Sequence, residues 1–205
     1  MPRVEPLRRR DLAQYETTLA SVEKALGVLP NSTLTMGRNP AVMKAFAELN
    51  AVVMQEGQVD AGLKQMVASV VSSAAGCAYC HAHTSHVATH RGVDESKIEA
   101  LWDFETSGLF SAAEKAALRV ARGAGLTPNA VTDEDMEDLR SHFTDDQVVE
   151  IVAVIANFGF LNRWNDTMAT ELERSPLAWA REHLAGRGWQ VGKHRPTGEL
   201  ESIEV

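Results

Sequence analysis

The chain has 205 residues, of which 44% are apolar and 23% charged, so it is long enough for one compact domain with its own core. Its formal net charge of -8 argues against a protein that binds nucleic acid or anionic lipid, because such binding needs a basic stripe. The sequence shows neither an apolar run of the roughly 20 residues that span a membrane nor the apolar stretch of a secretory signal, so we expect a cytoplasmic protein that binds neither nucleic acid nor membrane.

Helical periodicity dominates the first part of the chain. Apolar residues recur at helical spacing over 12–26, and Gly27 then ends that segment. Asn39 followed by Pro40 is typical of a helix start, because Asn caps the first turn and proline lacks an N–H that a helix would need to pair. Asp60 is a second N-cap candidate, for a helix that runs toward the cysteines.

Further capping signals divide the rest of the chain into helices, and no alternating run bounded by turns indicates a strand. The segment 148–172 is long and strongly apolar at its start, so we expect it to cross the core. These patterns predict an all-α helical bundle. The capping residues are Asp94, Ser111 with Glu114, Thr132, and Thr144 with Gln147.

The composition changes after the segment that ends near residue 175. Residues 1–175 are predicted to form a single all-helical domain with the cysteine segment, 60–100, at its centre. One short helix is expected over 179–184, and the glycine-rich stretch that follows it is typical of an arm. We therefore describe 176–205 as a C-terminal arm, either mobile or packed on a neighbouring subunit.

Two apolar helical segments resemble each other at an offset of 85 residues. Residues 63–70 and 148–155 share a Val-Ala pair and coincident apolar positions. The resemblance suggests two pseudo-repeated helical units, of which only the first carries thiols. The same offset pairs Cys80 with Asn165.

Cys77 and Cys80 are the two cysteines of the chain, and they form a Cys-x-x-Cys pair followed closely by histidines. On a helix, both cysteines and His83 lie along one stripe. A histidine beside a cysteine favours the thiolate, which is the nucleophile, and a helix N-terminus adds to this effect. The pair therefore favours a functional role for the two thiols. The histidines of this segment are His81, His83, His86 and His90.

Spacing alone leaves four interpretations of this segment. A redox dithiol would cycle between two thiols and a Cys77–Cys80 disulfide. A zinc site would use both cysteines and two of the histidines. Covalent haem attachment fits the string Cys-x-x-Cys-His81, and the last interpretation is a pair of small apolar core residues without chemistry.

The segment from Gly76 through Cys-Ala-Tyr-Cys80, with a histidine one turn later and a helix ending in Gly92, resembles the core of the alkylhydroperoxidase D-like and carboxymuconolactone decarboxylase family. The resemblance covers about 20–172, and the segment 160–166 resembles the longer, peroxidase-related members. It implies the all-helical fold of that family. It also implies a homo-oligomer, with dimers, trimers and hexamers known, and a thiol-dependent antioxidant peroxidase.

The resemblance also implies a mechanism. Cys80 would attack a hydroperoxide and Cys77 would resolve the product as a disulfide, which an external dithiol reductant would reduce. No metal or organic cofactor is needed for this cycle. The family's proton-relay Glu and His positions fall on Gln65 and Thr84, and His83, one residue early, is the candidate substitute.

Glu150 is the candidate for the missing carboxylate, because the offset of 85 residues pairs it with Gln65. The predicted catalytic residues are therefore Cys77, Cys80, His83 and Glu150. Two alternatives remain open: a non-catalytic redox-sensing or binding protein on the same scaffold, and a carboxymuconolactone decarboxylase-like enzyme that does not use the thiols.

Overall fold

The computed structural model describes residues 1–197, which form ten α-helices and four 3-10 helices and contain no strand. The prediction of an all-α bundle is confirmed. Within 1–197, no helix is both long enough and apolar enough to cross a membrane.

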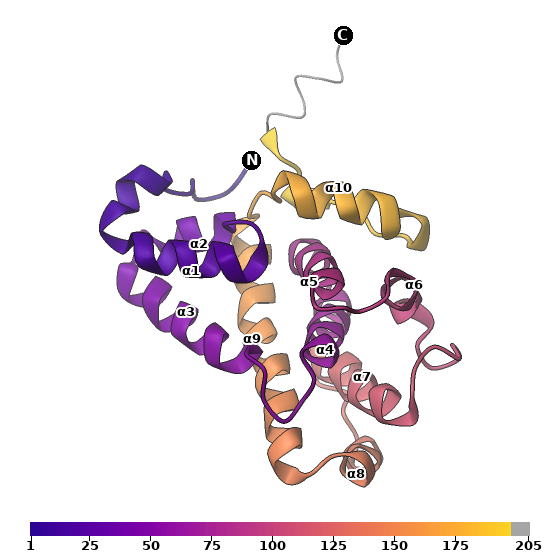
Figure 1. Cartoon of the computed structure of the whole chain (residues 1–205). Coiled ribbons are helices and arrows are strands. Elements are labelled where there is room, and N and C mark those ends of the chain that lie inside the picture. The colour runs from indigo at the N-terminus through magenta and orange to yellow at the C-terminus, as the bar shows by residue number, and fades with distance from the viewer. Residues whose placement is uncertain (198–205) are drawn as a thin grey trace.

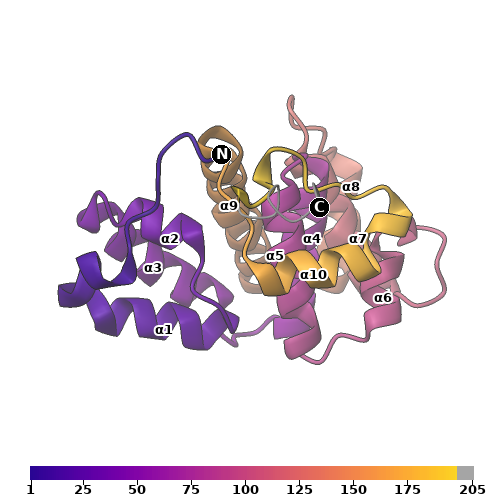
Figure 2. The same cartoon turned by 90° about the horizontal axis from the view of Figure 1, so that it is seen from above.

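The N-terminal helices form a group on one side of the molecule, beside the long helix α9 (Figures 1 and 2). This group has its own small core, built around Leu12, Leu19, Met36 and Met43. Its second helix follows Pro30 and was not expected from the sequence. The members are η1 (Arg9–Tyr15), α1 (Glu16–Leu26), α2 (Asn31–Met36) and α3 (Pro40–Met54).

A second and larger group of helices lies on the other side of α9 and surrounds α4, which is buried along most of its length. Helix α5 carries the cysteine segment and packs along α4, and α7 covers another side of α4. The members are α4 (Ala61–Ala74), α5 (Ala78–His90), α6 (Glu95–Glu99), η2 (Ala100–Asp103), α7 (Ala112–Gly125) and α8 (Asp133–His142).

Helix α9 (Asp145–Met168) joins the two groups. It packs on α3 from the first group and on α4, α5 and α7 from the second (Figure 1). Leu161 contacts the apolar cores of both groups. The prediction that this segment crosses the core is therefore confirmed, although the helix ends at Met168 because Ala169 adopts a left-handed conformation, with φ of 50°.

The C-terminal segment folds back onto its own chain. It consists of α10 (Arg174–His183), η3 (Ala185–Arg187) and η4 (Gly192–His194), and α10 packs on α5. The indole N–H of Trp189 donates to the Ala78 carbonyl at 3.2 Å. The buried side chains that hold this segment in place are Leu177, Leu184, Trp189 and Val191. The part of the expected arm over 198–205 lies outside the described residues.

The predicted capping residues act as such. Asn39 and Asp60 accept hydrogen bonds from the first-turn N–H groups of α3 and α4. Ser111, Thr132 and Thr144 each form a complete capping box, and Gly27 ends α1 with φ of 75°. These local signals explain why the helix starts could be predicted from the sequence.

Candidate active site

The two cysteines lie at the N-terminus of α5. The chain turns at Gly76, with φ of 73°, Cys77 then occupies the N-cap position, and Cys80 lies in the first helical turn. Both thiols are free, and their residues are 1% and 2% exposed. A helix N-terminus stabilises negative charge, which favours a thiolate, whereas burial of the sulfurs opposes it.

Cys80 opens onto a cavity of about 300 Å³ between the N-terminal helices, α5 and α9. Tyr79, His83 and Thr84 of the same helix also line it, whereas Cys77 does not. Its volume lies within the range of small-molecule sites. Most of the lining is apolar, and its large apolar side chains include Met36, Met43, Phe46, Met54, Phe158 and Leu161.

A buried carboxylate, Glu173, stands behind His83. Its Oε2 atom lies 2.5 Å from His83 Nε2, and its Oε1 atom accepts hydrogen bonds from the Tyr79 hydroxyl and the Asn31 N–H. Burial raises the pKa of Glu173, but the charge of His83 and the hydrogen bonds from its three partners outweigh burial, so the pKa lies below its usual value. An ionised Glu173 therefore holds His83 on the wall of the Cys80 cavity.

The two thiols are coupled. A hydrogen bond from Cys80 lowers the pKa of Cys77 to about 6, against burial and with help from His194. Burial and the neighbouring Cys77 raise the pKa of Cys80, although Asn165 Nδ2 donates to its sulfur at 3.3 Å. The pair therefore carries one thiolate near neutral pH, mainly on Cys77, and the thiol–thiol hydrogen bond allows the proton to move between the sulfurs.

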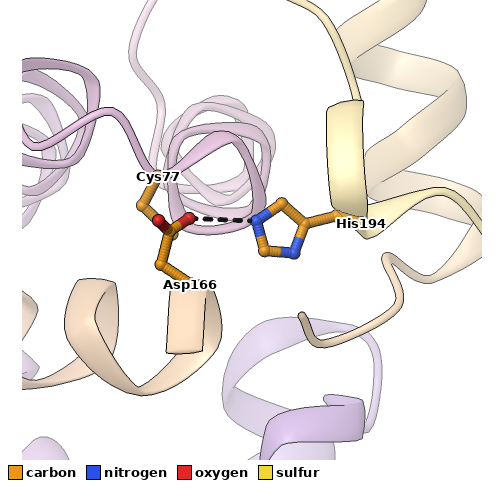
Figure 3. A group of neighbouring side chains, drawn as sticks. All are labelled: Cys77, Asp166 and His194. Carbon is orange, nitrogen blue, oxygen red and sulfur yellow. Dashed lines mark hydrogen bonds and ion pairs between the residues drawn. The ribbon is translucent and has the colours of Figure 1, made fainter. Parts of the chain in front are cut away.

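Cys77 has its own histidine and carboxylate, supplied by other elements. Figure 3 shows Cys77, Asp166 of α9 and His194 of η4, whose ligand atoms all lie within 4.8 Å of one another. His194 Nδ1 donates to the Thr170 carbonyl at 2.7 Å, so Nε2 faces Asp166 Oδ1 at 3.3 Å. Lys193 pairs with the other Asp166 oxygen at 2.7 Å.

This group combines an acid–base relay with the donor set of a zinc site. Burial lowers the pKa of His194, but Cys77, the Thr170 carbonyl and Asp166 outweigh burial and raise it. Thiolate, imidazole and carboxylate are zinc ligands, and a zinc-bound histidine commonly donates its other ring N–H to a carbonyl, as Nδ1 does here. The hydrogen bonds and the ion pair to Lys193 already occupy these atoms, so no ion is needed to explain the group.

The zinc site that was one of four interpretations of the cysteine segment is not formed by the helix histidines in this structure. His81 packs edge-on against Trp102, and burial lowers the pKa of His81 to about 4. His86 packs against His90, and burial also lowers the pKa of His86 to about 4. Among residues 1–197, the group around Cys77 is the cluster of three that can reach a shared ion.

Glu150 does not lie near the thiols. Its carboxylate accepts hydrogen bonds from two backbone N–H groups of the loop 55–60 and pairs with the buried Lys64 at 2.9 Å. Asn165, which contacts Cys80, lies fifteen residues further along α9, or about 22 Å at 1.5 Å per residue. The hypothesis that Glu150 relays a proton to Cys80 is therefore wrong.

Cys80, its candidate partner His83 and the two family relay positions, Gln65 and Thr84, all line the cavity. The Thr84 hydroxyl donates to the Cys80 carbonyl at 2.8 Å, so Thr84 has no free proton to relay. His83 faces the cavity despite its shift of one residue, because Glu173 fixes its ring. Cys80 also contacts Asn165, the position that the offset of 85 residues assigned to it.

Sequence reasoning missed Glu173, Asp166 and His194. Asp166 follows directly on Asn165, so the offset of 85 residues pointed close to it. Glu173 and His194 carry no local signal, because each reaches the cysteines only through a chain reversal more than ninety residues away along the sequence. His194 also lies in the stretch that was expected to be an arm.

Comparisons with known proteins give both a family and close structures. Residues 40–123 match the model of the Carboxymuconolactone decarboxylase family. The uncharacterized protein YdfG of Bacillus subtilis (strain 168) is 30% identical over 128 residues, which are 62% of this chain and 84% of YdfG. The crystal structure of the debrominase Bmp8 is 39% identical with a TM-score of 0.83, and the match covers 87% of this chain and 96% of Bmp8.

Two further structures extend this comparison. A cysteine-to-alanine variant of Bmp8 in complex with 2,3,4-tribromopyrrole is 38% identical, with a TM-score of 0.84 over the same shares of the two chains. A peroxidase-related protein with the AhpD core from Ralstonia eutropha JMP134 has a TM-score of 0.70 at 23% identity, over 80% of this chain and 87% of that chain. The second similarity supports the fold alone.

Proposed function

This chain belongs to the carboxymuconolactone decarboxylase family, whose members include enzymes, and we propose that it is a dithiol-dependent reductase of small apolar organic molecules. The observation that carries this proposal is the position of Cys80 on an apolar cavity of about 300 Å³, with His83 and its carboxylate on the same wall. An apolar cavity selects an organic substrate over small polar ones such as hydrogen peroxide. Cys77, which lies outside the cavity and is hydrogen-bonded to Cys80, is the second thiol of the redox pair.

The first candidate substrate is an organic hydroperoxide. Proton transfer to Cys77 gives the Cys80 thiolate, which attacks the terminal peroxide oxygen. The O–O bond breaks, the alkoxide takes a proton from His83, and Cys80 becomes a sulfenic acid. Cys77 then attacks the Cys80 sulfur and expels hydroxide, which leaves as water. The products are one alcohol, one water and a Cys77–Cys80 disulfide, and an external thiol reductant restores the pair.

The second candidate is a halogenated aromatic ring, favoured by the similarity to a debrominase over 87% of the chain. The overall reaction balances with the same dithiol: the ring exchanges its halogen for a proton, and halide is released. The two electrons come from Cys77 and Cys80, which become a disulfide. A cavity lined by Phe46, Phe158 and methionines suits a flat apolar ring as well as a hydroperoxide.

One experiment separates the two substrates and tests the proposal. The reduced protein is mixed with cumene hydroperoxide, hydrogen peroxide or 2,3,4-tribromopyrrole, and thiol loss, alcohol and bromide are measured. We expect thiol loss far faster than that of free cysteine with one of the two organic compounds. Mass spectrometry should then show a Cys77–Cys80 disulfide. The ratio of alcohol to bromide formed identifies the substrate class.

Two other functions predict different outcomes. Oxidation of the thiols no faster than free cysteine would contradict the proposal and favour a redox sensor or a binding protein. A decarboxylase-like enzyme would keep its activity when both Cys77 and Cys80 are replaced by serine. The reductase must lose all activity in that double variant.

We also propose that the protein forms a homo-oligomer, such as a dimer, trimer or hexamer. Large apolar side chains are exposed on α3 and on α9, and these two helices pack on each other. Sedimentation equilibrium would give the number of subunits. The exposed residues are Leu49, Val52, Val149, Val152 and Phe160.

A further inference from the structure

A second cavity, of about 380 Å³, lies on a different face of α9. The positions of α9 that line it are 159, 162, 163, 166 and 167, whereas 158, 161 and 165 line the Cys80 cavity. At 3.6 residues per turn, the two sets are rotated by about 135° around the helix axis. Because the cavities are separate, a molecule in the second one does not compete for the space that faces Cys80.

The second cavity is cationic, although the whole chain has a formal net charge of -8. Arg3, Arg163 and Lys193 line it, against one acidic residue, Asp166. The two guanidinium groups are each held by a backbone carbonyl, at 2.7 Å and 2.9 Å. Positioned guanidinium groups recognise carboxylates through paired hydrogen bonds, so this cavity is suited to an anionic ligand.

Asn162 is a second and independent sign of a polar ligand. It lines the cavity, is 4% exposed, and neither its amide oxygen nor its amide nitrogen has a hydrogen-bond partner among residues 1–197. Buried amides are normally satisfied, because burial removes them from water. An amide that can both donate and accept would pair with a ligand that carries amide and carboxylate groups.

The cavity adjoins the Cys77 side of the dithiol. Asp166 lines the cavity and also belongs to the group with Cys77 and His194, whose ligand atoms lie within 4.8 Å (Figure 3). The Asp166 side chain is 34% exposed, so this carboxylate forms the boundary between the cavity and the sulfur. Asp166 is therefore the residue that the cavity and the Cys77 group share.

We propose that this cavity binds the reductant, a small thiol that carries carboxylates, and directs it to Cys77 of the oxidised pair. The proposal rests on the proposed function in one respect, that the dithiol cycles through a disulfide. A cavity of this volume admits a molecule of a few amino-acid residues, so it favours two molecules of a small monothiol over a reducing protein domain.

The reduction balances in two exchanges. In the disulfide, Cys77 no longer raises the pKa of His194, so the first thiol gives its proton to Nε2 of the neutral imidazole. The sulfur of that thiol bonds to Cys77, and the Cys77–Cys80 bond breaks. Cys80 leaves as the thiolate that Asn165 hydrogen-bonds. A second thiol attacks the mixed disulfide, gives its proton to Cys80, and releases Cys77 as a thiolate beside the protonated His194. Two thiols lose two electrons and form one disulfide, and the protein pair gains them.

The test begins with the protein oxidised chemically by diamide, so it does not depend on the physiological oxidant. Glutathione, which carries two carboxylates, is compared with neutral 2-mercaptoethanol, and each rate is divided by the rate of that thiol with a simple aromatic disulfide. We expect the normalised rate for glutathione to exceed that for 2-mercaptoethanol at least tenfold, to saturate with glutathione concentration, and to fall as salt is added.

Charge reversal locates the binding site. In Arg163→Glu and in Arg3→Glu, the ratio of the glutathione rate to the 2-mercaptoethanol rate should fall about tenfold. The matched control is Arg140→Glu, on α8 and outside both cavities, which should leave the ratio unchanged.

Equal normalised rates for the two thiols, absence of saturation, or a ratio that the two variants do not change would each overturn the reductant site. Failure of diamide to form the Cys77–Cys80 disulfide would overturn it as well. Failure of the proposed function is distinguishable, because it appears as slow oxidation of the reduced protein by the hydroperoxide and the bromopyrrole, while the diamide-oxidised protein still reacts with glutathione.

Discussion

The two sulfurs of one four-residue motif lie in opposite surroundings. Cys80 faces an apolar cavity bounded by the N-terminal helices, and His83, held by Glu173, lies on the wall of the same cavity. Cys77 faces Asp166 and His194, beside a cavity lined by cationic side chains. Each thiol thus has a histidine and a carboxylate of its own.

Under the proposed function, this difference divides the reaction between the two sides of α5. An apolar cavity desolvates a neutral organic substrate, whereas a cationic cavity concentrates an anionic reductant. Separate sites allow oxidation and recycling to occur without exchange of ligands at one place. The following predictions change one side at a time, from the largest expected effect to the smallest.

The largest effects should come from the cysteines themselves. Cys80→Ser should abolish turnover, a loss of at least about a thousandfold, because no nucleophile faces the substrate. Cys77→Ser should allow one turnover with a hydroperoxide and then stop at the Cys80 sulfenic acid, detected by mass spectrometry after dimedone trapping. Undiminished turnover in both variants would refute the proposed chemistry on both sides.

Replacement of the Cys80-side carboxylate should have the next largest effect. Glu173→Gln removes the charge that orients His83, so kcat/KM should fall about a hundredfold, in the range of general acid–base catalysis. The same change in Glu182, which is exposed on α10, is the matched control and should change nothing. Thermal unfolding of each variant separates a loss of chemistry from a loss of fold, and a loss of activity equal in the two variants would count against the role of Glu173.

Filling the apolar cavity should weaken the binding of large substrates and leave the reaction with small oxidants unchanged. Ala47→Phe adds a ring to the lining, so KM for cumene hydroperoxide or a halogenated pyrrole should rise about tenfold. Thiol oxidation by hydrogen peroxide should stay the same, because that molecule needs little room. Equal slowing with large and small oxidants would show that the cavity does not admit the substrate.

The lowered pKa of Cys77 should appear in the pH dependence of its alkylation. With the pKa of Cys77 lowered to about 6, the rate with iodoacetamide should rise with pH through about 6 and level off above 7, because the thiolate reacts. In His194→Asn the midpoint should move upward, toward the roughly 8.5 of a free thiol, since a cationic partner is lost while Asp166 and its partner Lys193 remain. His142→Asn on α8 is the control, and a midpoint that does not move in His194→Asn would contradict the assignment of His194.

The smallest effect on activity should come from Glu150. Glu150→Gln weakens the pair with Lys64, which is buried at 2% side-chain exposure and also donates to the Val53 and Gln55 carbonyls. Stability should fall by about 1–3 kcal/mol, measured by urea unfolding. The rate of thiol oxidation should stay unchanged. A large decrease of that rate in the folded variant would show that Glu150 takes part in the reaction.

Much of the fold was predictable because its signals are local. Asn39, Asp60 and Ser111 cap helices through N–H groups three residues away, and helical periodicity needs only neighbouring turns. The same holds for Cys80 and His83, which share a cavity wall because both belong to the first turns of α5. The helix α2 was missed, since it is six residues long and has no capping side chain.

The acid–base partners were decided by tertiary structure. Glu173 and His194 reach the cysteines only because the chain reverses after α9 and buries apolar side chains of its C-terminal segment against α5. Glu150 was the wrong carboxylate, because an offset between similar segments ignores the roughly 22 Å of helix that separates it from Asn165. The sequence by itself determined the helices, the thiol pair and its histidine, whereas packing between distant segments determined which charges meet each sulfur.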